Sequence, residues 1–211
     1  MEFRRNIEDK LKAWSQSPFR KPLVLRGARQ VGKTTAVKQF AVNYEQFIYL
    51  NLETDDAKSF EGERDIHKIV DRIFFLKDGE KGKADTLIFI DEIQEVPSAL
   101  NMLRYFYEEY PEYHVIAAGS LLESLFDRDV SFPVGRVDYL YMYPFTFGEF
   151  LEALGERNAL NAYRQVPVPD YAVDKLMQLF HTYTLVGGMP EAVYRLSLIH
   201  ISEPTRHAQI S

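Results

Sequence analysis

The stretch that decides the fold is Gly27–Thr34, which reads GARQVGKT and has the Gly-x(4)-Gly-Lys-Thr spacing of a phosphate-binding loop. A short apolar run at 23–25 precedes it, and a helical pattern over 34–42 follows it. Glycines let such a loop wrap closely around phosphate oxygens, and the amino end of the next helix favours anions. The sequence therefore predicts a nucleoside triphosphate site at a strand-to-helix junction.

The loop also suggests a role for its last residues. Lys33 can reach the β- and γ-phosphates, and the hydroxyl of Thr34 can bind magnesium. The alternative interpretation is a glycine turn with an exposed lysine, which the flanking strand and helix disfavour. The predicted nucleotide-binding residues are Gly27, Ala28, Arg29, Gln30, Val31, Gly32, Lys33, Thr34 and Thr35.

A second motif lies at the end of another apolar run. Residues 87–90 are apolar and lead into Asp91 and Glu92. A strand ending there would bring Asp91 to the magnesium ion, with Thr34 as the other predicted metal ligand. Glu92 could then polarise the attacking water as a general base, with Lys33 as the second catalytic group. Taken alone the pattern is weak, because many strands end in an exposed acidic residue.

Two further residues are candidates for the same site. Ser120 follows the apolar run 115–118 and could be a polar sensor near the γ-phosphate, or equally a helix N-cap with Glu123 at N3. Arg136 precedes the strand predicted over 137–143 and could be an arginine finger, acting in cis or across a subunit boundary. The alternative for Arg136 is a surface arginine or a structural ion pair.

The order of the predicted elements indicates an α/β fold. Apolar strands that alternate with helices are typical of a mainly parallel sheet covered on both faces, which is a three-layer sandwich. Helices alone follow Pro144, over 146–154, over 170–184 and from Pro190 onward. We expect an N-terminal helix over 1–20, a nucleotide-binding core over 21–145, a partial helical lid or linker over 146–195, and a separate tail over 196–211.

Composition limits the partners. The 211-residue chain has a net charge of −6, which argues against wholesale electrostatic binding of DNA but leaves a local basic patch open. It has no cysteine, which excludes disulfides and fits a cytoplasmic location. Met1–Lys12 lacks the apolar segment of a secretory signal, and no apolar run approaches the roughly 20 residues that span a bilayer. We therefore expect no membrane partner.

The chain has several motifs that resemble those of one family and occur in the same order, at 26–35, 91–94, 119–120, 133–137 and 143–150. Over about residues 1–195 the chain looks like the bacterial and archaeal AAA-type ATPases, whose ATPase core is followed by a C-terminal domain of unknown function. The resemblance implies a P-loop NTPase core with strand order 5-1-4-3-2, ATP and Mg²⁺ as ligands, and a helical region after the core.

The chain departs from that family at its end. Residues 196–206 resemble a translated transposase-type sequencing adapter in a single reading frame, and residues 207–211 fit an index followed by the next adapter bases. We therefore expect 196–211 to be a non-native tail. The C-terminal domain would then be a missing partner in cis.

The function expected from these motifs is Mg²⁺-dependent ATP hydrolysis, with self-association as a further expectation. The alternative is a nucleotide-gated interaction or regulatory module with slow turnover and a link to DNA. A GTPase is disfavoured because the chain lacks an Asn-Lys-x-Asp pattern. A small-molecule kinase is disfavoured by the acidic pair Asp91–Glu92.

Overall fold

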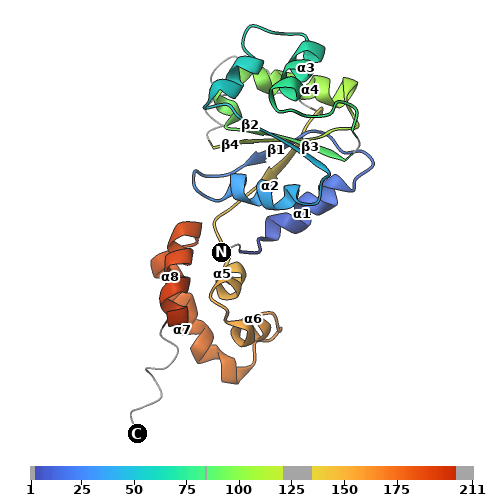
Figure 1. Ribbon diagram of the computed structural model, residues 1–211. Coiled ribbons are helices and arrows are strands. Elements are labelled where there is room, and N and C mark those ends of the chain that lie inside the picture. Colours follow the sequence, from blue (N-terminus) through green and yellow to red (C-terminus); the bar gives the residue numbers. More distant parts are fainter. Residues whose placement is uncertain (1–2, 84, 121–134, 203–211) are drawn as a thin grey trace. The chain divides into compact units, whose positions relative to one another are not determined.

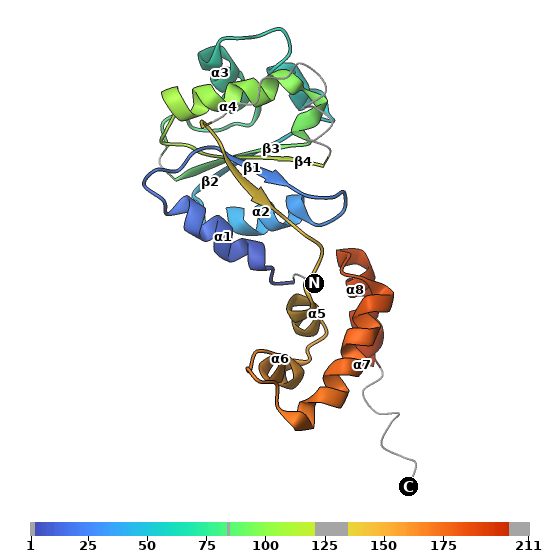
Figure 2. The same ribbon diagram turned by 180° about the vertical axis from the view of Figure 1, so that it is seen from behind.

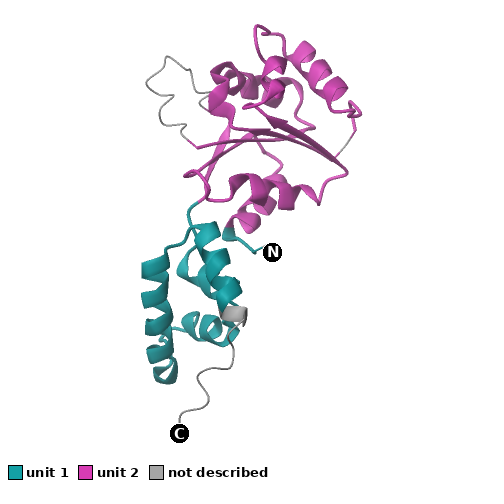
Figure 3. Ribbon diagram, turned by 60° about the vertical axis from the view of Figure 1, so that its left-hand side comes forward, with its two compact units in different colours: residues 1–6, 143–211 teal, residues 7–142 magenta. Residues whose placement is uncertain are grey.

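The computed structural model describes residues 3–83, 85–120 and 135–202 (Figure 1). The chain forms two compact units (Figure 3). The sheet unit comprises residues 7–142, and the helical unit combines residues 1–6 with residues 143–211. The chain therefore passes from one unit to the other twice, after residue 6 and after residue 142.

Five parallel strands form the sheet of the sheet unit, in the order β2-β3-β4-β1-β5. This is the predicted order 5-1-4-3-2 counted from the other edge, so the predicted α/β P-loop NTPase fold is confirmed. The strands are β1 (Leu23–Arg26), β2 (Gln46–Asn51), β3 (Thr86–Asp91), β4 (His114–Gly119) and β5 (Asp138–Tyr141).

Helices cover both faces of this sheet (Figures 1 and 2). Successive side chains of a strand point to opposite faces, so Leu87 and Phe89 of β3 join one apolar cluster while Ile88 and Ile90 join the other. The first cluster includes α1 (Asn6–Ser15) and α2 (Lys33–Ala41), and the second includes α3 (Ile66–Leu76) and α4 (Pro97–Glu109). The sheet unit is thus a three-layer sandwich.

Some short elements differ from the sequence prediction. β5 begins one residue later and ends two residues earlier than the strand predicted over 137–143, and residue 143 belongs to the helical unit. Two 3₁₀ helices, η1 (Asp55–Ser59) and η2 (Ile93–Glu95), were not predicted, since three to five residues are too few to show a period.

The helical unit is built from α5 (Phe147–Ala153), α6 (Arg157–Tyr163), α7 (Asp170–Val186) and α8 (Pro190–Ser202). One apolar cluster of this unit contains Phe145, Phe150, Leu154 and Val193, and Phe3 packs against it from the start of the chain. The sequence predicted α5, α7 and the start of α8, but it did not predict α6.

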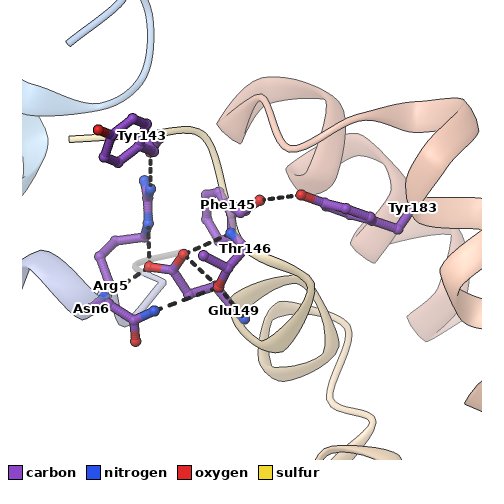
Figure 4. Close-up of polar contacts among 7 residues, drawn as sticks. All are labelled: Arg5, Asn6, Tyr143, Phe145, Thr146, Glu149 and Tyr183. Carbon is purple, nitrogen blue, oxygen red and sulfur yellow. Dashed lines mark hydrogen bonds and ion pairs between the residues drawn. The ribbon is translucent and has the colours of Figure 1, made fainter. Parts of the chain in front are cut away.

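A buried polar cluster holds Arg5 and Asn6 in the helical unit (Figure 4). Arg5 and Glu149 form an ion pair with Nε to Oε1 at 3.0 Å, and both side chains are buried. Arg5 Nη2 also donates to the carbonyl of Tyr143 at 2.7 Å, and the backbone N–H of Asn6 donates to Glu149 Oε1 at 2.8 Å. Glu149 further completes a capping box with Thr146 at the start of α5.

The predicted tail begins inside α8, which runs without interruption from Pro190 across position 196 to Ser202. Residues 203–211 lie outside the described residues, so the non-native origin of 196–211 stays a prediction. Among the helices that the structure describes, none combines the length and the apolar character needed to cross a membrane.

Candidate functional site

The predicted phosphate-binding loop occupies the turn between the end of β1 and the start of α2. Gly27 and Gly32 have φ values of 151° and 95°, and Gln30 also lies in the left-handed region at 60°. A Cβ added to Gly27 would lie 2.3 Å from the carbonyl oxygen of Met142. Val31 is fully buried and anchors the loop in the core, whereas Ala28 is exposed. The chain can follow this path only with glycine at the first position.

Lys33 is the first residue of α2, and its side chain folds back over the loop. Its Nζ donates to the carbonyl oxygens of Gly27 and Ala28, both at 2.9 Å. Lys33 is only 6% exposed, and burial lowers the pKa of its ammonium group while the nearby carboxylates of Glu92 and Asp91 oppose that shift. A phosphate anion bound at this point would form strong, charge-assisted hydrogen bonds with the desolvated ammonium group of Lys33.

The amino end of α2 is open to an anion. Its N-cap is Gly32, which offers no side-chain hydrogen bond to the first N–H groups of the helix. The first turn carries no acidic residue, and Thr35 is exposed there. Unsatisfied N–H groups and the helix dipole together favour bound phosphate.

The two predicted magnesium ligands lie together. Thr34 Oγ1 donates to Asp91 Oδ2 at 2.7 Å, although the two residues are 57 positions apart in the chain. Asp91 ends the fully buried strand β3. Burial raises the pKa of its carboxyl, with a further contribution from Glu92, while the hydrogen bond from Thr34 opposes the shift.

These oxygen atoms fit Mg²⁺, which is often bound by one or two protein oxygens together with substrate phosphates and water. Among the residues that the structure describes, no cluster of three or more His, Cys, Asp or Glu side chains could hold a metal by itself. A metal at Thr34 and Asp91 would therefore depend on the phosphates that it shares.

Glu92 lies directly after Asp91 and is half-buried. Its backbone is left-handed, with φ 52° and ψ 45°, at the turn from β3 into η2. Its own N–H donates to Asp91 Oδ1 at 3.1 Å. The structure thus brings Glu92 to the carboxyl end of β3, as predicted from the sequence, next to the predicted magnesium ligands.

Ser120 follows the carboxyl end of β4, whose residue Gly119 pairs with Arg26 of β1. Its hydroxyl accepts a hydrogen bond from Arg29 Nε at 3.4 Å, so the predicted sensor lies next to the phosphate-binding loop. The alternative N-cap interpretation involves Glu123, which lies outside the described residues.

The structure does not bring Arg136 to this loop. β5 runs parallel to β1, and Asp138 pairs with Leu23, the first residue of β1. Arg136 therefore precedes β5 at the amino edge of the sheet, whereas the phosphate-binding loop lies at the carboxyl edge. Its guanidinium Nε is 2.7 Å from Glu108 Oε1, and both side chains are exposed.

Tyr49 is a site residue that sequence reasoning missed. It lies on β2, and its hydroxyl donates to Asp91 Oδ2 at 3.3 Å. Burial, reinforced by Asp91, raises the pKa of Tyr49 to about 12, so it stays a donor at neutral pH. Lys38 of α2 lies over its ring, with Nζ 4.1 Å from the centroid. The pairing of β2 with β3 could have suggested Tyr49, because it places β2 beside Asp91.

Comparison with known proteins supports this assignment of the fold. A family model described as "AAA domain" matches residues 19–151. No curated protein matches the chain.

Solved structures share the fold at low sequence identity. They include a Walker-type ATPase of Pyrococcus abyssi (17% identity, 96% of this chain and 68% of that chain, TM-score 0.56). Drosophila ORC bound to DNA has 14% identity over 92% of this chain and 58% of that chain, with a TM-score of 0.52. PCH-2 of C. elegans has 15% identity over 96% and 64%, with a TM-score of 0.53. This chain thus spans less than two thirds of the Drosophila and C. elegans chains.

Proposed function

This chain belongs to the AAA domain family, and on that premise we propose that it binds ATP with Mg²⁺ and hydrolyses the bond to the γ-phosphate. The observation that carries the proposal is the contact between Thr34 Oγ1 and Asp91 Oδ2 at 2.7 Å. It joins the phosphate-binding loop to the end of β3, so the groups for phosphate and for metal lie side by side.

Each candidate site residue has a distinct role in this proposal. Lys33 and the first N–H groups of α2 bind the phosphates. Thr34 and Asp91 hold the metal, and Tyr49 keeps Asp91 in place through its hydroxyl. When bound, Mg²⁺ would neutralise charge on the phosphates during transfer.

Glu92 is the proposed general base. It would accept the proton that water loses as its oxygen bonds to the γ-phosphorus and the bond to the bridging oxygen breaks, which leaves ADP and inorganic phosphate. The position of Glu92, one residue after Asp91 and next to the metal ligands, supports this role.

Two substitutions test the proposal together. Lys33→Ala should weaken ATP binding by about ten-fold or more, because a charge-assisted hydrogen bond is lost. Glu92→Gln should keep the ATP affinity and lower turnover by about 100-fold or more. Binding is measured by calorimetry and turnover by phosphate release. Unchanged ATP affinity in Lys33→Ala would contradict the proposed phosphate site. Wild-type turnover in Glu92→Gln would contradict the role of Glu92 as the general base.

If Arg136 is an arginine finger, we propose that it acts across a subunit boundary, because it precedes β5 at the amino edge of its own sheet. If the chain self-associates in this way, mixing Arg136→Ala subunits with Lys33→Ala subunits should restore part of the ATPase activity that each variant lacks. Absence of recovery would leave Arg136 with the structural ion pair to Glu108.

A nucleotide-gated interaction module is the second candidate, and the surface of α7 favours it. Val173, Met177 and Phe180 follow one face of this helix and are 40%, 61% and 44% exposed. DNA is a weaker candidate partner, because the net charge of −6 opposes it. Measuring the ATPase rate with and without DNA would separate these two kinds of partner. A rate that depends on DNA would favour nucleic acid over an apolar protein partner.

A further inference from the structure

Gln94 lies two residues after the proposed base and contacts its carboxylate. Gln94 Nε2 donates to Glu92 Oε2 at 2.6 Å. Among the described residues, no second donor to the Glu92 carboxylate is found. One carboxylate oxygen of Glu92 is therefore held, while the other stays available to a water molecule.

The orientation of the Gln94 amide follows from its surroundings. Its Nε2 faces two carboxylates, since Glu95 Oε1 also lies 3.4 Å from it. Its Oε1 is buried and has no hydrogen-bond partner in the part of the chain that the structure describes. Turning the amide over would place that oxygen against the carboxylates, so the donor must face Glu92. A buried acceptor without a partner costs stability, and such a cost calls for a functional explanation.

The backbone between the two residues is adapted to this contact. The backbone of Glu92 takes the left-handed conformation, which residues other than glycine rarely adopt. The next residue, Ile93, is fully buried and pins the turn to the core. Strained backbone of this kind persists where the surrounding structure holds it and is concentrated at functional sites.

We infer that Gln94 is a positioning residue for Glu92: by holding Oε2, it fixes the rotation of the carboxylate and leaves Oε1 to accept the proton of the attacking water. This inference rests on the proposed role of Glu92 as general base. Gln94 itself touches neither the water nor the phosphate.

The first test separates binding from turnover. Gln94→Leu removes the amide and Gln94→Glu keeps the size while replacing the donor by an acceptor. Both should lower kcat about ten-fold or more, with the Kd for ATP within about two-fold of wild type. Glu95→Ala is the matched control, because it removes only the 3.4 Å neighbour of the same amide, and its kcat should stay within about two-fold. An unchanged or raised kcat in Gln94→Leu would overturn the inference.

A double-mutant cycle tests whether Gln94 acts through Glu92. In the Glu92→Gln background, Gln94→Leu should cause no further loss of kcat beyond about two-fold. The same fold-loss in both backgrounds would overturn the inference while leaving Glu92 as the base. Wild-type turnover in Glu92→Gln alone would overturn the proposed base, and the inference with it.

A readout without nucleotide completes the test. In protein labelled with ¹⁵N-glutamine, the Gln94 side-chain amide signal is the one missing from Gln94→Leu. It should be displaced from the position typical of exposed glutamine, and Glu92→Ala should move it toward that position, whereas Glu95→Ala should move it less. A Gln94 signal that ignores Glu92→Ala would overturn the inference.

Discussion

Only glycine fits at position 27, directly after β1. Its φ of 151° lies in the region that favours glycine, and a Cβ there would meet the backbone of Met142 at 2.3 Å. Backbone cannot move aside as the end of a flexible side chain can. The opening of the phosphate-binding loop is therefore fixed by sterics as well as by the needs of a phosphate.

We predict that Gly27→Ala lowers the free energy of unfolding by roughly 3 kcal/mol, from strain and overpacking together, and weakens ATP binding. Gly62→Ala is the matched control: its φ is +69°, but its Cβ would meet nothing within 4 Å. That control should cost only about 1 kcal/mol and leave ATP binding unchanged. Urea unfolding and calorimetry measure both, and equal costs in the two variants would contradict the steric argument.

Site residues that depend on a local motif could be predicted from the sequence. The loop residues follow from the spacing of one short motif, and Asp91 follows from an apolar run that ends in an acidic pair beside such a motif, so neither needed knowledge of the sheet. Tyr49 needed the pairing of β2 with β3, which no local pattern contains. The position of Arg136 followed from the direction of β5, because a residue that precedes a parallel strand lies at the amino edge.

At the scale of elements, the start of α5 combines a helix cap with a buried ion pair. Burial by itself would raise the pKa of Glu149, but the N–H groups of Thr146 and Asn6 and the charge of Arg5 outweigh it, so the pKa is lowered below the usual 4.5. The guanidinium of Arg5 also lies 4.1 Å from the centroid of the Phe145 ring. No sequence pattern could reveal this pair, since its members are 144 positions apart.

We predict that Glu149→Gln destabilises the helical unit by about 3–5 kcal/mol, because Arg5 then keeps an unpaired buried charge. Since the folded pKa is the lower one, the stabilisation is complete above pH 4.5 and is lost as the pH falls below that value. Glu191→Gln is the control, because its pair with Arg195 in α8 is exposed and should contribute little. Urea unfolding at pH 7 and pH 4 checks this, and equal losses in the two variants would contradict it.

At the scale of the whole molecule, the two units differ in how local their contacts are. The sheet unit is one continuous segment, so its alternation of strands and helices could be predicted from the sequence pattern. Its strand order was implied by the family resemblance. The helical unit draws Phe3 and Arg5 from the opposite end of the chain. Phe3 makes edge contacts with Phe145 and Tyr194, with ring centroids 5.6 and 6.3 Å apart.

We predict that deleting residues 1–6 increases amide hydrogen exchange across α5–α8, because both the Phe3 contacts and the Arg5 ion pair are lost. Exchange in β1, β3 and β4 should change little. Deletion of residues 1–2 alone is the control, because it spares Phe3 and Arg5. Faster exchange confined to the strands would show that the first six residues support the sheet unit instead.

The double passage of the chain between its units has a consequence for synthesis on the ribosome. Domains generally fold as units while the chain emerges from its amino end. The sheet unit can fold once residue 142 has been synthesised. Arg5 can form its ion pair only after Glu149 has been synthesised, so the first residues of the chain are among the last to pack. An affinity tag fused to the amino terminus would therefore directly precede residues that pack in the unit that is completed last.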